Sequence, residues 1–166
     1  MPPLPAIPGF EIRAATEADV PLILSFITKL AVYEKLAHEV TATEESLRET
    51  LFGSRRFAEV ALGFFNGEPV GFVLFFHNYS TFLAKPGVYI EDLFVDEEFR
   101  GRGFGRALFL HVGKLARERN CGRLEWAVLD WNEPAIGFYK KLGAAAMDEW
   151  TVFRITGENL KRLGNE

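Results

Sequence analysis

The residues best suited to chemistry lie in a short stretch between Val88 and Arg106. The run Val88–Val95 is apolar apart from two adjacent carboxylates, Glu91 and Asp92, and its β-branched and aromatic residues predict a buried strand. Ionising a carboxylate in an apolar strand is costly, so its affinity for a proton rises and it can take one from a substrate. Because side chains alternate along a strand, we expect Glu91 and Asp92 to face opposite sides, with only one of them in a substrate cleft.

A basic, glycine-rich segment follows this strand and opens a predicted helix. Backbone N–H groups and the dipole at a helix N-terminus attract anions, and glycines let the backbone approach them closely. The spacing excludes a dinucleotide-binding fingerprint, which needs glycine at position 106, and a P-loop, which needs Gly-Lys-Ser/Thr. The alternative to phosphate binding is a plain turn with solvated arginines. The predicted phosphate-binding residues are Arg100, Gly101, Arg102, Gly103, Phe104, Gly105 and Arg106.

Length and composition predict one compact domain over residues 10–166, preceded by a loose, proline-rich arm at residues 1–9. The formal charge of −4 argues against a nucleic-acid partner. A single cysteine and three scattered histidines indicate neither an internal disulfide nor a metal site. The proline-broken start and the lack of an apolar run of roughly 18 residues predict a cytoplasmic protein with no membrane segment.

Periodicity and turn residues place these motifs in an α/β fold with a mixed sheet flanked by helices. Thr16, Thr43 and Asn132 are predicted helix N-caps, and Asn66-Gly67 predicts a two-residue hairpin turn. The predicted strands are residues 10–14, 58–65, 70–77, 88–95, 124–129 and 151–155, and the predicted helices are residues 17–36, 43–52, 104–119 and 132–143.

These motifs together resemble the GNAT acetyltransferase superfamily. Arg-x-x-Gly-x-Gly at the start of a helix looks like its acetyl-CoA pyrophosphate loop. The segments KLAVYE (residues 29–34), YIEDLFV (89–95) and VLDWNEPAIGFYKKLGA (128–144) resemble the spermidine/spermine and thialysine acetyltransferase branch, in the same order along nearly the whole chain. The resemblance implies a GNAT fold, acetyl-CoA as cosubstrate, no metal and a homodimer.

The resemblance also implies roles for individual residues. Tyr139 would take the place of the catalytic tyrosine that assists departure of the CoA thiolate, and Glu91 that of the acidic residue near the attacking amine. Beyond the loop, the implied cofactor-binding residues are Leu93, Phe94, Val95, Asn132, Glu133, Pro134 and Ala135. The implied substrate-binding residues are Tyr33, Glu34, Glu91, Glu125, Trp126 and Ala127.

Ser80 bears on the identity of the amine. Polyamine-acetylating relatives have an acidic residue at the matching position, where it can hold a second ammonium, whereas serine resembles the thialysine branch. We therefore expect direct acetyl transfer to a primary amine of a small molecule, either thialysine-like or a diamine or polyamine. The alternatives are an acyl-CoA sensor without turnover and a protein or peptide N-acetyltransferase. Asp148 and Glu149 are further carboxylates that could receive a small cation, but the segment near Trp150 is shorter than the corresponding stretch of the family, so the resemblance does not define their roles.

Overall fold

The computed structural model describes residues 6–164, so the first five residues of the predicted arm lie outside the described range. The chain divides into two compact units, one ending at Ala127 and the other beginning at Val128. Each unit is described by itself, and one domain over residues 10–166 stays a prediction. No helix within residues 6–164 combines the length and the apolar character needed to span a bilayer.

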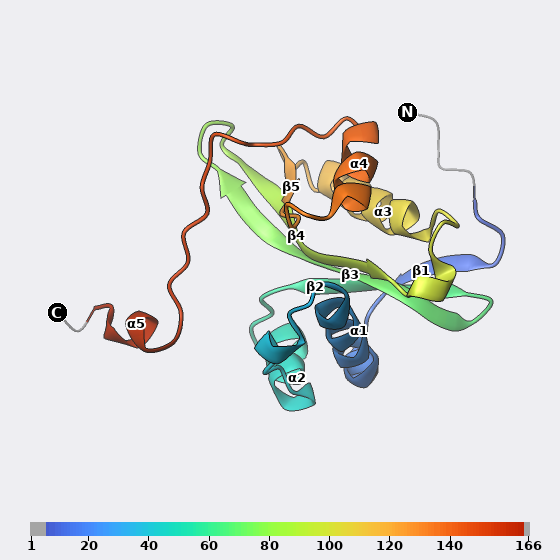
Figure 1. Cartoon of the computed structure of the whole chain (residues 1–166), viewed down its shortest axis with the longest axis horizontal. Helices are drawn as coiled ribbons and strands as arrows, with labels where there is room; N and C mark the ends of the chain where they lie inside the picture. Colours follow the sequence, from blue (N-terminus) through green and yellow to red (C-terminus); the bar gives the residue numbers. More distant parts are fainter. Residues whose placement is uncertain (1–5, 165–166) are drawn as a thin grey trace. The chain divides into compact units, whose positions relative to one another are not determined.

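The first unit contains one mixed sheet of five strands (Figure 1). The strands are β1 (Phe10–Ala14), β2 (Glu59–Phe65), β3 (Glu68–Ser80), β4 (Lys85–Val95) and β5 (Leu124–Trp126), and they lie in this order across the sheet. All neighbours pair antiparallel except β4 and β5, which are parallel. Asn66 and Gly67 have φ angles of 50° and 82°, which confirms the predicted hairpin turn between β2 and β3.

Helices cover both faces of this sheet. The helices α1 (Val20–Tyr33) and α2 (Glu44–Phe52) lie on one face and α3 (Phe104–Glu118) on the other (Figure 1). Three short 3-10 turns, η1 (Glu17–Asp19), η2 (Ala37–Glu39) and η3 (Glu97–Phe99), lie between the main elements. Phe26 of α1 stacks on Phe72 of β3 at 5.5 Å, and Phe104 of α3 stacks on Phe10 of β1 at 4.4 Å. The sheet therefore has an aromatic core on each face.

The predicted N-caps of the first two helical segments are confirmed. The Asp19 carboxylate accepts hydrogen bonds from the Thr16 N–H at 2.8 Å and from Arg13 at 2.7 Å, and the Arg13 hydrogen bond is the main reason that the pKa of Asp19 falls to about 2. Thr43 and Ser46 cap α2 reciprocally, with N–H to side-chain oxygen distances of 3.1 Å and 3.0 Å. These bonds occupy N–H groups that the helices cannot satisfy themselves.

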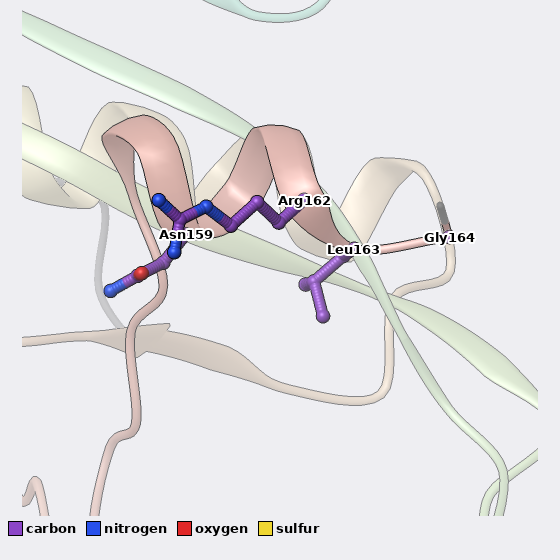
Figure 2. Close-up of a pocket in the computed structure, with 4 residues that line it drawn as sticks. All are labelled: Asn159, Arg162, Leu163 and Gly164. Atoms are coloured by element: carbon purple, nitrogen blue, oxygen red, sulfur yellow. The ribbon is translucent and has the colours of Figure 1, made fainter. Parts of the chain in front are cut away.

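The second unit contains two helices, α4 (Glu133–Lys141) and α5 (Gly157–Arg162). Asn132 caps α4 as predicted, because its side-chain oxygen accepts the Ala135 N–H at 3.3 Å. The sequence did not predict α5. The small hollow beside α5 is lined by Asn159, Arg162, Leu163 and Gly164, and the Arg162 side chain extends back along the helix towards Asn159 (Figure 2). None of the predicted site residues lines this hollow.

Several predicted elements differ in the structure, and β3 and β4 are longer than their predicted ranges. The prediction of a strand at residues 151–155 was wrong. This segment forms no regular structure, and Val152 and Phe153 are 82% and 91% exposed. A strand needs a neighbour for its backbone hydrogen bonds, and within residues 6–164 no strand pairs with this segment. The predicted strand 124–129 ends at Trp126, and the predicted helix 17–36 consists of η1 followed by α1, which ends at Tyr33.

Candidate active site

The two carboxylates of β4 lie at an irregularity in the sheet. Leu74 of β3 pairs with Asp92, whereas its neighbour Phe75 pairs with Ile90. Glu91 is therefore an extra residue in β4 that has no pairing partner in β3. This is a β-bulge, which interrupts the alternation of side chains along the strand. As a result Glu91 and Asp92 line the same cavity, and the expectation that they face opposite sides was wrong.

That cavity has a volume of about 400 Å³ and lies where the end of α1, the segment after it and β4 come together. It is lined by Ile27, Leu30, Ala31, Glu34, Leu36, Glu39, Val40, Thr41, Ala42, Glu91 and Asp92. Four of these residues are acidic and none is basic, so the cavity favours a small cation. Within residues 6–164, no group of three or more His, Cys, Asp or Glu side chains is placed to hold a metal ion.

Two carboxylates of this cavity, Asp92 and Glu34, bind protons more tightly than exposed carboxylates do. Burial, together with the nearby charges of Glu91 and Glu34, raises the pKa of Asp92 to about 7. Burial, and to a smaller extent the charge of Glu91, also raises the pKa of Glu34. A carboxyl group that titrates near neutrality is suited to exchanging protons with a substrate. The sequence analysis identified Asp92 as an unusual carboxylate in an apolar strand but assigned it no role in the reaction.

The glycine-rich loop opens α3 as predicted. Gly101 and Gly103 have φ angles of 76° and 85°, and Gly103 is the N-cap of the helix. Residues with a Cβ rarely adopt this left-handed conformation, so the loop depends on glycine at both positions. The first N–H groups of α3 have no acceptor inside the helix and point out of its N-terminus, where they can bind an anion.

The three arginines of the loop have different surroundings. The Nε of Arg100 donates to the Val95 carbonyl at 2.9 Å, and its guanidinium lies 4.4 Å from the centre of the Tyr33 ring. Arg102 donates to a backbone carbonyl of η3 at 3.4 Å. Arg106 is exposed on the first turn of α3. Arg100 therefore joins the end of β4 to the end of α1, whereas Arg106 presents its charge to solvent.

The strand β4 continues beyond its neighbour β5. Pairing between the two strands covers only Val88–Ile90, whereas β4 runs on to Val95. Leu93, Phe94 and Val95 therefore have no partner in β5 on that side. Backbone groups in this stretch can pair with the amides of an extended ligand.

Two of the predicted substrate-binding residues have partners within the sheet region. The Glu125 carboxylate of β5 forms an ion pair with Arg123 at 2.7 Å and accepts a hydrogen bond from Asn78 at 3.0 Å. The Trp126 ring packs edge-on against a phenylalanine of α3 at 4.9 Å. Ala127, the last residue of the first unit, is exposed. Of the six predicted substrate-binding residues, the cavity brings together Glu34 and Glu91.

The remaining predicted site residues belong to the second unit. Asn132 is buried at the cap of α4, and Glu133, Pro134 and Ala135 form its first turn. Tyr139 lies further along α4, and burial raises its pKa to about 12. The roles of these residues in cofactor binding and catalysis stay predictions.

A mixed sheet whose fourth strand leads through a glycine-rich loop into a helix is the GNAT arrangement. The model of the acetyltransferase (GNAT) family matches residues 28–144, and the chain belongs to this family. The resemblance found in the sequence and the predicted α/β fold class are thereby confirmed, and the protein is an acetyltransferase.

Similar proteins support this assignment. The chain is 37% identical to the L-ornithine N5-acetyltransferase NATA1 of Arabidopsis thaliana, over 92% of this chain and 86% of the relative. It is 39% identical to the thialysine N-epsilon-acetyltransferase of Bos taurus, over 93% of this chain and 97% of the relative. Among solved structures, an integron cassette protein from the mobile metagenome of V. cholerae matches with a TM-score of 0.79 and 26% identity, over 95% of this chain and 99% of that chain.

Proposed function

We propose that this enzyme transfers the acetyl group of acetyl-CoA to the side-chain amine of a small diamino compound such as thialysine or ornithine. The acidic cavity carries the proposal, because four carboxylates and no basic residue line a space of about 400 Å³. The names of the relatives support the substrate class, since ornithine and thialysine are both small amino acids with a second amine. The proposal includes a cytoplasmic location, which a chain with one cysteine suits.

Acetyl-CoA would supply an acetyl group activated as a thioester. The N-terminus of α3 and residues 101–106 would hold its diphosphate, and the backbone of Leu93–Val95 would pair with its pantetheine arm. Asn132–Ala135 are the further residues that we propose contact the cofactor. The positive φ angles of the loop and the early end of β5 support these assignments.

The reaction needs a neutral amine. An alkyl ammonium of pKa about 10.4 is neutral in about one molecule in 2,500 at pH 7, so deprotonation costs about 4.6 kcal/mol. A carboxylate of the cavity would bear this proton, and Glu91 would lie beside the amine. Tyr139 would donate a hydrogen bond to the departing thiolate. The amine would attack the thioester directly, without a covalent enzyme intermediate.

An amine panel tests this function. Thiol release from acetyl-CoA is measured with thialysine, ornithine, lysine, putrescine, spermidine and spermine, and with peptides that offer a lysine or a free N-terminus. We expect the highest kcat/KM with the diamino acids and a lower value with spermine. A preference for peptides would favour a protein acetyltransferase. Binding of CoA with thiol release at background for every amine would favour the acyl-CoA sensor.

A further inference from the structure

We infer that Asp92, and not Glu91, accepts the proton of the substrate ammonium, while Glu91 and Glu34 hold that ammonium beside it by their charge. The inference rests on the proposed function and deepens it. It arises from the β-bulge, which places both β4 carboxylates on one cavity.

The two carboxylates differ in their surroundings. Glu91, the extra residue of the bulge, is exposed, whereas Asp92 is half-buried and faces Leu74 across the sheet. Asp92 also directly precedes Leu93, the first of the residues proposed to bind the pantetheine arm. An amine held at Asp92 is therefore one residue nearer along the strand to the expected thioester than an amine held at Glu91. Partial burial also removes water that would compete for the proton.

The charges that face Asp92 are all negative. Glu34, the residue after α1, Glu39 of η2 and Glu91 of β4 itself line the same cavity as Asp92. Strand β3 presents the apolar Leu74, and no basic residue lines the cavity. A proton on Asp92 removes the cost of burying its charge and relieves the repulsion from Glu91 and Glu34, so its pKa rises from 3.8 to about 7. The equilibrium constant for proton transfer from an ammonium to Asp92 is therefore about a thousandfold larger than that for transfer to an ordinary aspartate.

The proton count of the reaction fits this role. The ammonium gives one proton to the Asp92 carboxylate, and the neutral nitrogen then forms a bond to the thioester carbon. As the carbon–sulfur bond breaks, the nitrogen loses a second proton and the sulfur leaves as a thiolate that becomes a thiol. Asp92 returns its proton to solvent, so the net products are the amide, CoA and one proton.

The pH dependence of kcat/KM distinguishes the two carboxylates. In the wild-type enzyme we expect an acid limb with an apparent pKa near 7, because Asp92 must be ionised to accept the proton. Asp92→Asn removes this limb and lowers kcat/KM by about 10² to 10⁴-fold. Glu91→Gln, the matched substitution on the adjacent residue, lowers kcat/KM through a higher KM and keeps the limb. A limb that persists in Asp92→Asn and disappears in Glu91→Gln would overturn the inference.

A second measurement needs neither turnover nor a substitution at these positions. Titration of the side-chain carboxyl carbons of the wild-type protein by NMR should show Asp92 with a midpoint near 7, and a midpoint near 4 would overturn the inference. Wild-type turnover separates the two proposals. If the wild-type enzyme acetylates amines but Asp92 behaves as an ordinary carboxylate, only the role of Asp92 fails. If no amine is acetylated, the proposed function fails, and the role of Asp92 fails with it.

Discussion

At the scale of the residue, the burial of Tyr139 decides how it can assist the thiolate. Burial raises the pKa of Tyr139 to about 12, while a thiol such as that of CoA has a pKa of about 8.5 if cysteine is a guide. Complete proton transfer from the phenol to the thiolate would be uphill by about 5 kcal/mol. A hydrogen bond that strengthens as charge builds up on sulfur needs no such transfer. We therefore expect Tyr139 to remain protonated throughout the reaction.

Substitution of Tyr139 tests this role. Tyr139→Phe should lower kcat by about 10 to 100-fold, because it removes one hydrogen bond made chiefly in the transition state. The affinity for CoA, measured by calorimetry, should change less than twofold. Because the pKa of Tyr139 lies near 12, Tyr139 should produce no basic limb in the pH profile of kcat below pH 11, and any such limb should persist in the variant.

The matched control for this substitution is Tyr79→Phe, since Tyr79 is an exposed tyrosine of β3 that lines neither the cavity nor the loop. Its kcat should equal that of the wild type. An unchanged kcat in Tyr139→Phe would remove Tyr139 from the catalytic machinery.

At the scale of the element, the N-terminus of α3 combines two anion-attracting features. Its first N–H groups lack acceptors within the helix, and the loop before it is shaped by two glycines with positive φ. Of the loop arginines, Arg100 is held by Val95 and Tyr33, whereas Arg106 is exposed on the first turn. We therefore expect the backbone to form the proposed diphosphate site and Arg106 to add an exposed positive charge to it.

The contribution of Arg106 is measurable as cofactor affinity. Arg106→Gln should weaken CoA binding about tenfold, which corresponds to about 1.4 kcal/mol, because one ion pair with the diphosphate is lost. Added salt should reduce the difference in CoA affinity between the variant and the wild type, because it screens the ion pair. Arg117→Gln, at the other end of the same helix, is the control and should leave CoA affinity unchanged. An equal loss in both variants would show that general charge, and not the loop, attracts the cofactor.

Most elements of the first unit could be predicted from the sequence because each carries a local signal. The capping residues Thr16 and Thr43 and the Asn66-Gly67 turn act through contacts a few residues apart, so their outcome does not depend on the rest of the chain. The loop at residues 100–106 was found for the same reason.

The bulge at Glu91 could not be predicted, because it depends on how β4 registers against β3, two strands paired over a long hairpin. Strict alternation of side chains was the correct expectation for a regular strand and failed at this one residue. The cavity could not be predicted either, because Glu34 and Asp92 are far apart in the sequence and come together only in the folded unit. Sequence reasoning therefore singled out Glu34, Glu91 and Asp92, but neither Glu39 nor the cavity that all four residues line.

At the scale of the whole molecule, the segment 147–155 carries apolar side chains that the single chain leaves exposed. The exposed residues are Met147, Trp150, Val152, Phe153 and Ile155. Apolar residues clustered in this way mark an interaction surface more often than a solvent-facing one. Residues 151–155 have an apolar pattern typical of a strand but form no regular structure, and no strand within residues 6–164 pairs with them. A second copy of the chain is the partner we expect.

Light scattering after size exclusion tests this homodimer. The wild-type protein should have twice the chain mass of 18.7 kDa, and Phe153→Asp should shift the population towards the monomer, because a carboxylate would be buried in the contact. Phe82→Asp is the control, since Phe82 is fully exposed on the turn between β3 and β4 and lies outside the segment. A monomeric wild-type protein would contradict the prediction.

The side chain of Arg100 links the proposed cofactor-binding loop to the end of α1, beside the acidic cavity. Its Nε donates a hydrogen bond to the Val95 carbonyl at the end of β4, and its guanidinium stacks over the Tyr33 ring. Tyr33 directly precedes Glu34, which lines the acidic cavity. A cofactor that reorients this guanidinium necessarily alters the packing of Tyr33. In that case we expect the proposed amine and cofactor to bind as thermodynamically coupled ligands, each changing the affinity of the other by the same factor.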